Sequence, residues 1–222
     1  MKNQQLRMKH ADNPDKFVDS EIELHETIEE LFSLAASPEL LPVFASSGGF
    51  QTILGLITHE NTDISLAVLS LLQEICDSEM IEEADETAQQ EQEEEEADTE
   101  RGANESSSES IVSTCLVKSI VNGQGLELII QNLSRLDEAN KEDATGVYNT
   151  LSIIENLIEL QESLAIDICE KTHILKYLLI RLRVRTFDTN KLYCSELLSI
   201  LLQADSSNQR LVRCLFNFVL YN

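Results

Sequence analysis

A short apolar phrase occurs three times in this chain, and its spacing constrains the fold more than any other feature. The copies are Leu69-Ser70-Leu71-Leu72, Leu151-Ser152-Ile153-Ile154 and Leu198-Ser199-Ile200-Leu201. The last two copies are 47 residues apart, and the first two are 82 apart with a polar acidic stretch between them. Without that stretch the first interval is about 49, and a helical period in the forties is typical of armadillo and HEAT repeats. We therefore predict an all-α, right-handed solenoid of stacked helices behind an N-terminal helical cap.

The composition favours the same fold class. The chain has no Trp, seven Gly and three Pro among 222 residues, and 42% of its residues are hydrophobic. A β-sandwich or barrel needs a turn roughly every 8–12 residues, and this chain has few residues that form turns. Helical repeats of this kind usually present a long binding surface to other proteins.

Local patterns place the first helices. Apolar residues recur at helical spacing over residues 20–36, behind a Ser20–Glu23 pair that fits a capping box. Pro38 suits the first position of the next helix, and Gly48-Gly49 should end that segment. Residues 62–76 are apolar on almost every side, so this helix should lie between two layers.

The helices can be grouped into repeats of three. Two later triplets are expected, at 110–122, 125–136 and 140–160, and at 162–170, 172–184 and 190–203. The predicted organisation is a polar segment with a capping helix at 1–36, a first armadillo-like repeat at 37–77, an acidic disordered insert at 78–109, two further repeats at 110–205, and the start of a truncated fourth repeat at 206–222.

The acidic insert carries much of the charge. The net charge is −24, and the stretch from Asp77 to Glu109 accounts for −14 of it, with fifteen acidic residues and Arg101 as its one basic residue. Such a stretch has too few apolar residues to fold alone. It is either a solvated loop with no specific role or a docking site for basic segments. Ser106, three residues before Glu109, is a candidate site for an acidophilic kinase.

The charge and the apolar runs exclude several classes of function. An acidic surface repels nucleic-acid phosphates and attracts basic partners, so we expect no direct nucleic-acid binding. No apolar run approaches 18 residues, and the start of the chain is polar, so we expect neither a membrane span nor a signal peptide. The sequence therefore predicts an intracellular protein.

No residues form a catalytic or metal-binding pattern. The five cysteines are scattered without CxxC spacing, and the four histidines are far apart. The Gly48-Gly49 pair lacks the Lys and Ser or Thr of a phosphate-binding loop. We therefore predict a protein that is not an enzyme and that uses no cofactor or metal.

One register of the repeat suggests a binding surface. Glu74, Asn156 and Gln203 stand five residues after the Leu that begins each copy of the phrase. In armadillo arrays this register often lines a groove, where polar side chains bind the backbone of an extended peptide. The alternative is that all three are simply exposed polar residues. Ser70, Ser152 and Ser199 stand where a nuclear import receptor would carry Trp, so the aromatic slots for its usual cargo are missing.

A basic patch interrupts the acidity. Its core is Lys176, Arg181, Arg183 and Arg185, with Asp188 as the opposing charge nearby. It is either a solvated helix face, a docking site for an acidic partner segment, or a contact for RNA in a larger particle. No aromatic residues are interleaved with it to support base stacking.

Longer runs resemble the beta-catenin-like protein 1 family over residues 2 to about 210, outside the acidic insert. They are Lys2-Asn3-Gln4-Gln5-Leu6-Arg7, Asp12-Asn13-Pro14-Asp15-Lys16-Phe17, Leu54-Gly55-Leu56, His59-Glu60-Asn61-Thr62-Asp63, Leu71-Leu72-Gln73-Glu74, Gln131-Asn132-Leu133, Arg135-Leu136-Asp137-Glu138, Asn149-Thr150-Leu151, Phe187-Asp188 and Asn190-Lys191-Leu192-Tyr193-Cys194-Ser195-Glu196.

The resemblance implies a nuclear, non-enzymatic protein of armadillo-like repeats that associates with the spliceosome. It also implies partners with basic, nuclear-localisation-type segments. These are a Myb-like core protein of the Prp19-associated complex and, in vertebrate relatives, a cytidine deaminase. An acidic groove would suit such ligands.

The sequence also departs from the family. The acidic insert is longer than expected, the family's basic import signal would lie upstream of Met1, and the resemblance is expected to end at about Arg213. The sequence thus predicts a scaffold in pre-mRNA splicing. The alternatives are a transport adaptor of the same fold, or a truncated inactive product. Self-association stays open.

Overall fold

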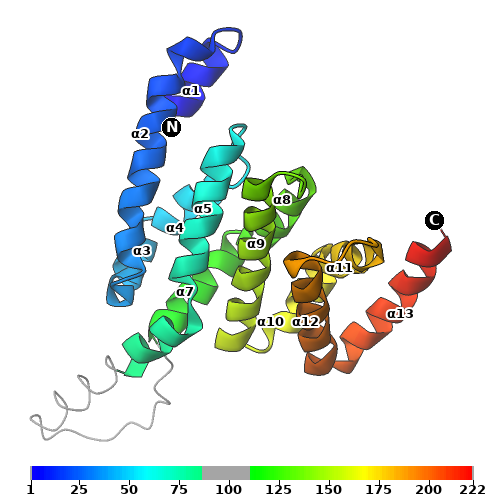
Figure 1. Cartoon of the computed structure of the whole chain (residues 1–222). Coiled ribbons are helices and arrows are strands. Elements are labelled where there is room, and N and C mark those ends of the chain that lie inside the picture. Colours follow the sequence, from blue (N-terminus) through cyan, green and yellow to red (C-terminus); the bar gives the residue numbers. More distant parts are fainter. Residues whose placement is uncertain (1, 87–110, 222) are drawn as a thin grey trace, which may run out of the picture.

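In the computed structural model, residues 2–86 and 111–221 are described, and within them every regular element is a helix (Figure 1). The first half contains α1 (Lys2–Lys9), η1 (Pro14–Lys16), α2 (Val18–Glu30), η2 (Leu31–Leu34), η3 (Pro38–Leu40), α3 (Leu41–Ser46), α4 (Gly49–Leu56), α5 (Thr62–Ile75) and a helix at 78–86. The second half contains α7 (Ile111–Asn122), α8 (Gly125–Asn132), η4 (Leu133–Arg135), α9 (Lys141–Leu160), α10 (Leu164–Lys171), α11 (Ile174–Arg183), α12 (Thr189–Ala204) and α13 (Ser206–Tyr221).

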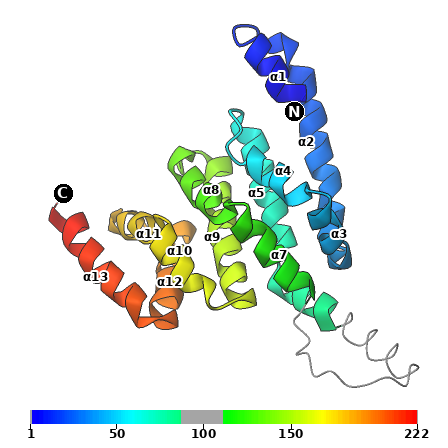
Figure 2. The ribbon, with the colours of Figure 1, turned by 180° about the vertical axis from the view of Figure 1, so that it is seen from behind.

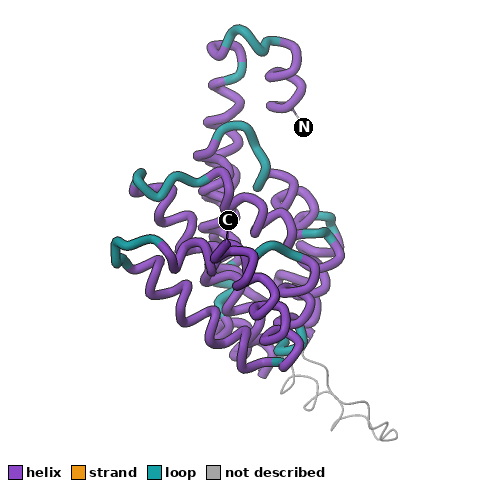
Figure 3. The backbone as a smooth tube through the Cα atoms, turned by 90° about the vertical axis from the view of Figure 1, so that its right-hand side faces the viewer, coloured by secondary structure: helices purple, strands orange, loops and turns teal. Residues whose placement is uncertain are grey.

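The helices stack in two layers. The long helices α2, α5, α9 and α12 lie side by side in sequence order (Figure 1), and each contacts the next. Seen from behind, α4, α7, α8, α10 and α11 form the second layer (Figure 2), where α4 packs on α5, α8 on α9, and α11 on α12. Short loops join the helices (Figure 3). The predicted all-α solenoid is confirmed, whereas the exact division into repeats stays a prediction.

The repeated phrase forms much of the core. Leu69, Leu71 and Leu72 of α5 are fully buried, and so are Leu151, Ile153 and Ile154 of α9. In the third copy Leu201 is fully buried, while Leu198 and Ile200 are half-buried. The helix predicted to lie between layers, α5, contacts α2, α4 and α9. Because α2 and α9 belong to the same layer as α5, the second layer covers α5 on one side only and Glu74 stays exposed, so the prediction that this helix lies between two layers is wrong.

Each long helix of the repeats begins at a short polar residue. The side chains of Asn61, Asn140 and Asp188 accept hydrogen bonds from backbone N–H groups in the first turns of α5, α9 and α12. These contacts satisfy amides that have no partner inside the helix, which explains why the helices start there.

The N-terminus differs from the prediction in two ways. Residues 2–9, expected only as a polar segment, form α1. The capping box at Ser20 is wrong, because α2 begins at Val18. Ser20 Oγ instead donates to Phe17 O at 2.7 Å and accepts from Asn3 Nδ2 at 2.8 Å. The hydroxyl therefore holds α1 against α2.

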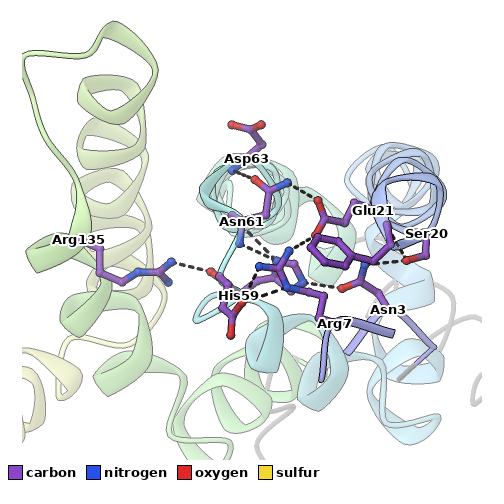
Figure 4. A network of polar contacts seen from close by, with 10 residues as sticks. Asn3, Arg7, Ser20, Glu21, His59, Asn61, Asp63 and Arg135 are labelled. Atoms are coloured by element: carbon purple, nitrogen blue, oxygen red, sulfur yellow. Dashed lines mark hydrogen bonds and ion pairs between the residues drawn. The ribbon is translucent and has the colours of Figure 1, made fainter. Parts of the chain in front are cut away.

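A directed chain of hydrogen bonds continues from this contact to the loop between α4 and α5 (Figure 4). The Asn61 N–H donates to His59 Nδ1 at 3.1 Å. This distance is shorter than the 3.4 Å between Nδ1 and Asn61 O, so we assign Nδ1 as the acceptor and the proton to Nε2, which then donates to Asn3 Oδ1 at 3.0 Å. The chain ends at Ser20 and fixes the N-terminal cap to the first repeat.

Arg7 makes a second link between the cap and the solenoid. Its guanidinium forms ion pairs with Glu21 and, at 2.6 Å, with Glu60, and it lies 4.6 Å from the centroid of the Phe17 ring. Arg135, from η4, donates to His59 O at 2.6 Å (Figure 4). The loop between α4 and α5 is thus held both by Arg7 of the N-terminal cap and by Arg135 of η4.

The predicted disordered insert is wrong at its first residues. Residues 78–86 are helical, with Ile81 fully buried and Asp85 5% exposed. Asp85 accepts hydrogen bonds from Val112 N at 2.8 Å and Ser113 N at 3.2 Å, so it caps α7 from across the insert. The rest of the insert, residues 87–109 with Ser106 among them, lies outside the described residues.

Candidate functional site

The three predicted groove residues occupy equivalent places on neighbouring helices. Glu74, Asn156 and Gln203 lie in the last or penultimate turn of α5, α9 and α12, which run in the same direction and end on the same side of the molecule (Figure 1). Glu74 and Gln203 are exposed, and Asn156 is half-buried. We call the exposed strip of these three helices the long-helix face. A binding role for the three residues stays a prediction.

The serines of the phrase contribute to packing on this face. Ser70 Oγ accepts from Asn149 Nδ2 at 3.0 Å, which links α5 to α9. Ser152 is only 9% exposed. Ser199 accepts from Gln203 Nε2 at 2.8 Å within α12. Small side chains at these positions let the three helices approach each other, and none of them offers an aromatic surface.

The long-helix face is acidic toward its C-terminal side. The last turn of α5 contains Glu74, and the second half of α9 contains Glu155 and Glu159, and neither stretch has a basic residue. Helix α12 contains one basic and one acidic residue, Lys191 and Glu196, both in its first half. The carbonyl ends of α5, α9 and α12 add partial negative charge on the same side. The field on this face therefore favours a cationic ligand.

Two tyrosines that the sequence analysis missed lie between α9 and α12. The rings of Tyr148 and Tyr193 have centroids 5.0 Å apart at 54°. The Tyr193 hydroxyl donates to Glu155 Oε2, and burial together with this carboxylate raises the pKa of Tyr193 above its usual value. Tyr148 lies four residues, about one helical turn, before Ser152 of the repeated phrase. A search of the residues one turn before the phrase could therefore have found it in the sequence.

The predicted basic patch is wrong for Arg181. Its side chain is 10% exposed, and Nε and Nη2 donate to the two oxygens of Glu138 at 2.6 and 3.0 Å. Nη2 also lies 2.7 Å from both oxygens of Asp188, and these partners raise the pKa of Arg181. Arg181 therefore joins the start of α9 to the loop between α11 and α12. Lys176, Arg183 and Arg185 are exposed.

Two cavities lie away from the long-helix face. One, of about 500 Å³, surrounds the Arg181 contacts near Thr186 and Thr189. The other, of about 680 Å³, lies between the N-terminal cap and α4, beside Phe17 and Leu56. Both are bounded by groups that already bond to each other, such as Arg181 with Glu138 and Arg7 with Glu60.

Within the described residues, no three His, Cys, Asp or Glu side chains are arranged to hold a metal ion. The five cysteines are free, and burial raises the pKa of Cys76, Cys169 and Cys194 to about 12, which keeps these thiols protonated. None of the described helices is long and apolar enough to cross a membrane.

Comparison with known proteins gives the family. The model of the family described as "Catenin-beta-like, Arm-motif containing nuclear" matches residues 1–218, so the match passes Arg213, where the resemblance was expected to end. Beta-catenin-like protein 1 of Homo sapiens and of Rattus norvegicus are each 39% identical over 212 residues, which is 95% of this chain and 33% of theirs. The Schizosaccharomyces pombe homolog is 33% identical over 217 residues.

The chain thus spans about a third of the length of these relatives. The family match covers both halves of the helical stack and the acidic segment between them. With this match and the stacked helices together, the chain belongs to the beta-catenin-like protein 1 family of armadillo-motif proteins.

Proposed function

We propose that this chain is a non-catalytic scaffold in pre-mRNA splicing, and that its long-helix face binds basic, nuclear-localisation-type segments of partner proteins. The observation that carries the proposal is the set of carboxylates Glu74, Glu155 and Glu159 on α5 and α9, on the side of the molecule where α5, α9 and α12 all end. An extended basic chain gains from both the carboxylates and the helix ends.

The family supports the nuclear setting, because its description names nuclear armadillo-motif proteins. The expected partner is a core splicing protein with a basic segment, such as the Myb-like protein of the Prp19-associated complex. Co-purification of the tagged chain with spliceosomal proteins from nuclear extract tests this setting. Recovery of transport receptors alone would contradict it.

The binding face is tested by a matched pair of charge reversals. Glu74→Lys reverses an exposed charge on α5, and Glu127→Lys makes the same change on α8, in the second layer. We expect Glu74→Lys to weaken binding of a fluorescent lysine- and arginine-rich peptide roughly three- to tenfold. Glu127→Lys should have a much smaller effect. Fluorescence anisotropy at fixed salt measures affinity, and circular dichroism checks that helicity is unchanged.

Two results would contradict the proposal. Equal weakening by both variants would mean that net charge alone attracts the peptide. Unchanged affinity in the Glu74→Lys variant would remove Glu74 from the site. Raising the salt concentration should weaken binding in every variant, because salt screens the attraction between exposed charges. The screening length is about 10 Å at 0.1 M ionic strength.

A further inference from the structure

We propose that Tyr148, Tyr193 and Glu155 form a subsite on the long-helix face that selects an arginine side chain of the bound basic segment. This inference rests on the proposed function and specifies the ligand at one point of the face.

The subsite has an aromatic end and an acidic end. Tyr148 is 43% exposed, and its ring packs against Tyr193, which is only 9% exposed. The Tyr193 hydroxyl reaches Glu155, seven residues after Tyr148 on the same side of α9. Tyr193 thus connects the exposed ring to the carboxylate, and buried Ser152 lies between them on α9.

The groups are held in place before any ligand arrives. Tyr148 is supported by a second ring, and the Glu155 carboxylate is oriented by the Tyr193 hydroxyl. A carboxylate can accept several hydrogen bonds, so the bond from Tyr193 leaves Glu155 able to accept from a ligand. A rigid site of this kind costs less entropy on binding.

The chemistry favours a guanidinium. Its planar face stacks on an aromatic ring, and its N–H groups bind a carboxylate in parallel pairs, whereas a lysine ammonium is a compact, strongly hydrated charge. Glu196, exposed one turn after Tyr193 on α12, adds a second negative charge beside the site. Serines stand where a nuclear import receptor would carry Trp. The Tyr148–Tyr193 pair supplies an aromatic surface at other positions of α9 and α12.

The test compares two labelled peptides, octaarginine and octalysine, on the whole chain at one salt concentration. We expect the chain to prefer octaarginine, and Tyr148→Ala to reduce that preference roughly three- to tenfold. Tyr148→Phe keeps the ring face and should keep the preference. Tyr193→Phe removes the hydroxyl that orients Glu155 and should lower the preference by a smaller factor. Phe187→Ala, which removes a 75% exposed aromatic ring from the loop before α12, is the control and should change neither affinity.

The outcomes separate the two proposals. If both peptides bind but Tyr148→Ala leaves their affinity ratio unchanged, the arginine subsite is overturned and the proposed function stands. If neither peptide binds the unmodified chain, both are overturned. Thermal unfolding of each variant checks that it is folded, which matters most for Tyr193→Phe because Tyr193 is only 9% exposed.

Discussion

At the scale of single residues, His59 is held in one protonation state by its neighbours. Its Nδ1 accepts from Asn61 N–H, which requires that Nδ1 carry no proton, whereas Nε2–H donates to Asn3 Oδ1 in the neutral and in the protonated ring alike. Burial is the main cause that lowers its pKa, and the Arg7 charge lowers it further. Protonation of His59 therefore breaks its bond with Asn61 inside the α4–α5 loop, while the bond from Nε2 to Asn3 of α1 persists.

We predict that acid lowers the stability of the folded chain through His59. Because the pKa of His59 is lower in the folded state, the unfolded chain takes up the proton first, and stability falls as the pH drops below about 6.5. The facing groups are Arg7, Glu21 and Glu60. The Arg7 guanidinium lowers the pKa of Glu60, so that carboxylate stays charged in this window.

The urea concentration at the unfolding midpoint should decrease when the pH is lowered from 7.5 to 5.5. His59→Gln should reduce that decrease, because Gln does not titrate. His173→Gln, at an exposed histidine before α11, is the control and should preserve the decrease. An identical decrease in the His59→Gln variant would mean that other groups cause it.

At the scale of helices, two glycines within helices, one in α9 and one in the last turn of α4, have opposite surroundings. A Cβ added to Gly146 on α9 would lie 2.3 Å from Leu66 Cδ2 on α5, so this glycine allows the two helices to approach closely. A Cβ added to Gly55 on α4 would meet nothing within 4 Å. The same substitution should therefore have opposite effects on stability.

Gly55→Ala should stabilise the protein by about 0.5–1 kcal/mol, because alanine loses less backbone entropy in a helix. Gly146→Ala should destabilise it by about 1–2 kcal/mol, because Leu66 must move. The double variant Gly146→Ala with Leu66→Ala should be destabilised by less than the sum of the effects of the two single changes. Denaturant unfolding measures the four variants and the unmodified chain, and equal effects of the two glycine variants would refute the packing explanation.

The helices that the sequence predicted are those with their own apolar period, such as α5 and α9, because that period reflects burial directly. Helix α1 was missed because it is polar, and it is held by distant partners of Asn3 and Arg7. Arg181 was misassigned for the same reason, since Glu138 is 43 residues away in sequence. Sequence spacing shows which residues share a helix face, but it does not show which charges pair between helices.

At the scale of the whole molecule, stability is shared between neighbouring helices. The long helices contact one another in order, so a local defect should affect mainly the adjacent helices. Arg181 offers a test, because it joins the start of α9 to the loop before α12 through Glu138 and Asp188.

We predict that Arg181→Met lowers stability by about 2 kcal/mol, since it leaves the Glu138 carboxylate without its main partner. Hydrogen exchange should accelerate in α9, α11 and α12 and stay nearly unchanged in α2 and α5. Arg185→Met, at an exposed position, should change little. Uniform acceleration along the chain would instead indicate one fully cooperative unit.

The bonds from Asp85 to the start of α7 have a consequence for how this family can vary. They join the two ends of the stretch at 87–110, so the helical stack depends on a fixed junction and not on how many residues lie beyond it. By loop-closure entropy, doubling the number of residues between two points that are fixed to each other costs only about 0.6 kcal/mol. Residues could therefore be gained, lost or exchanged there in evolution, or a foreign sequence grafted in the laboratory, while the junction keeps the repeats in register.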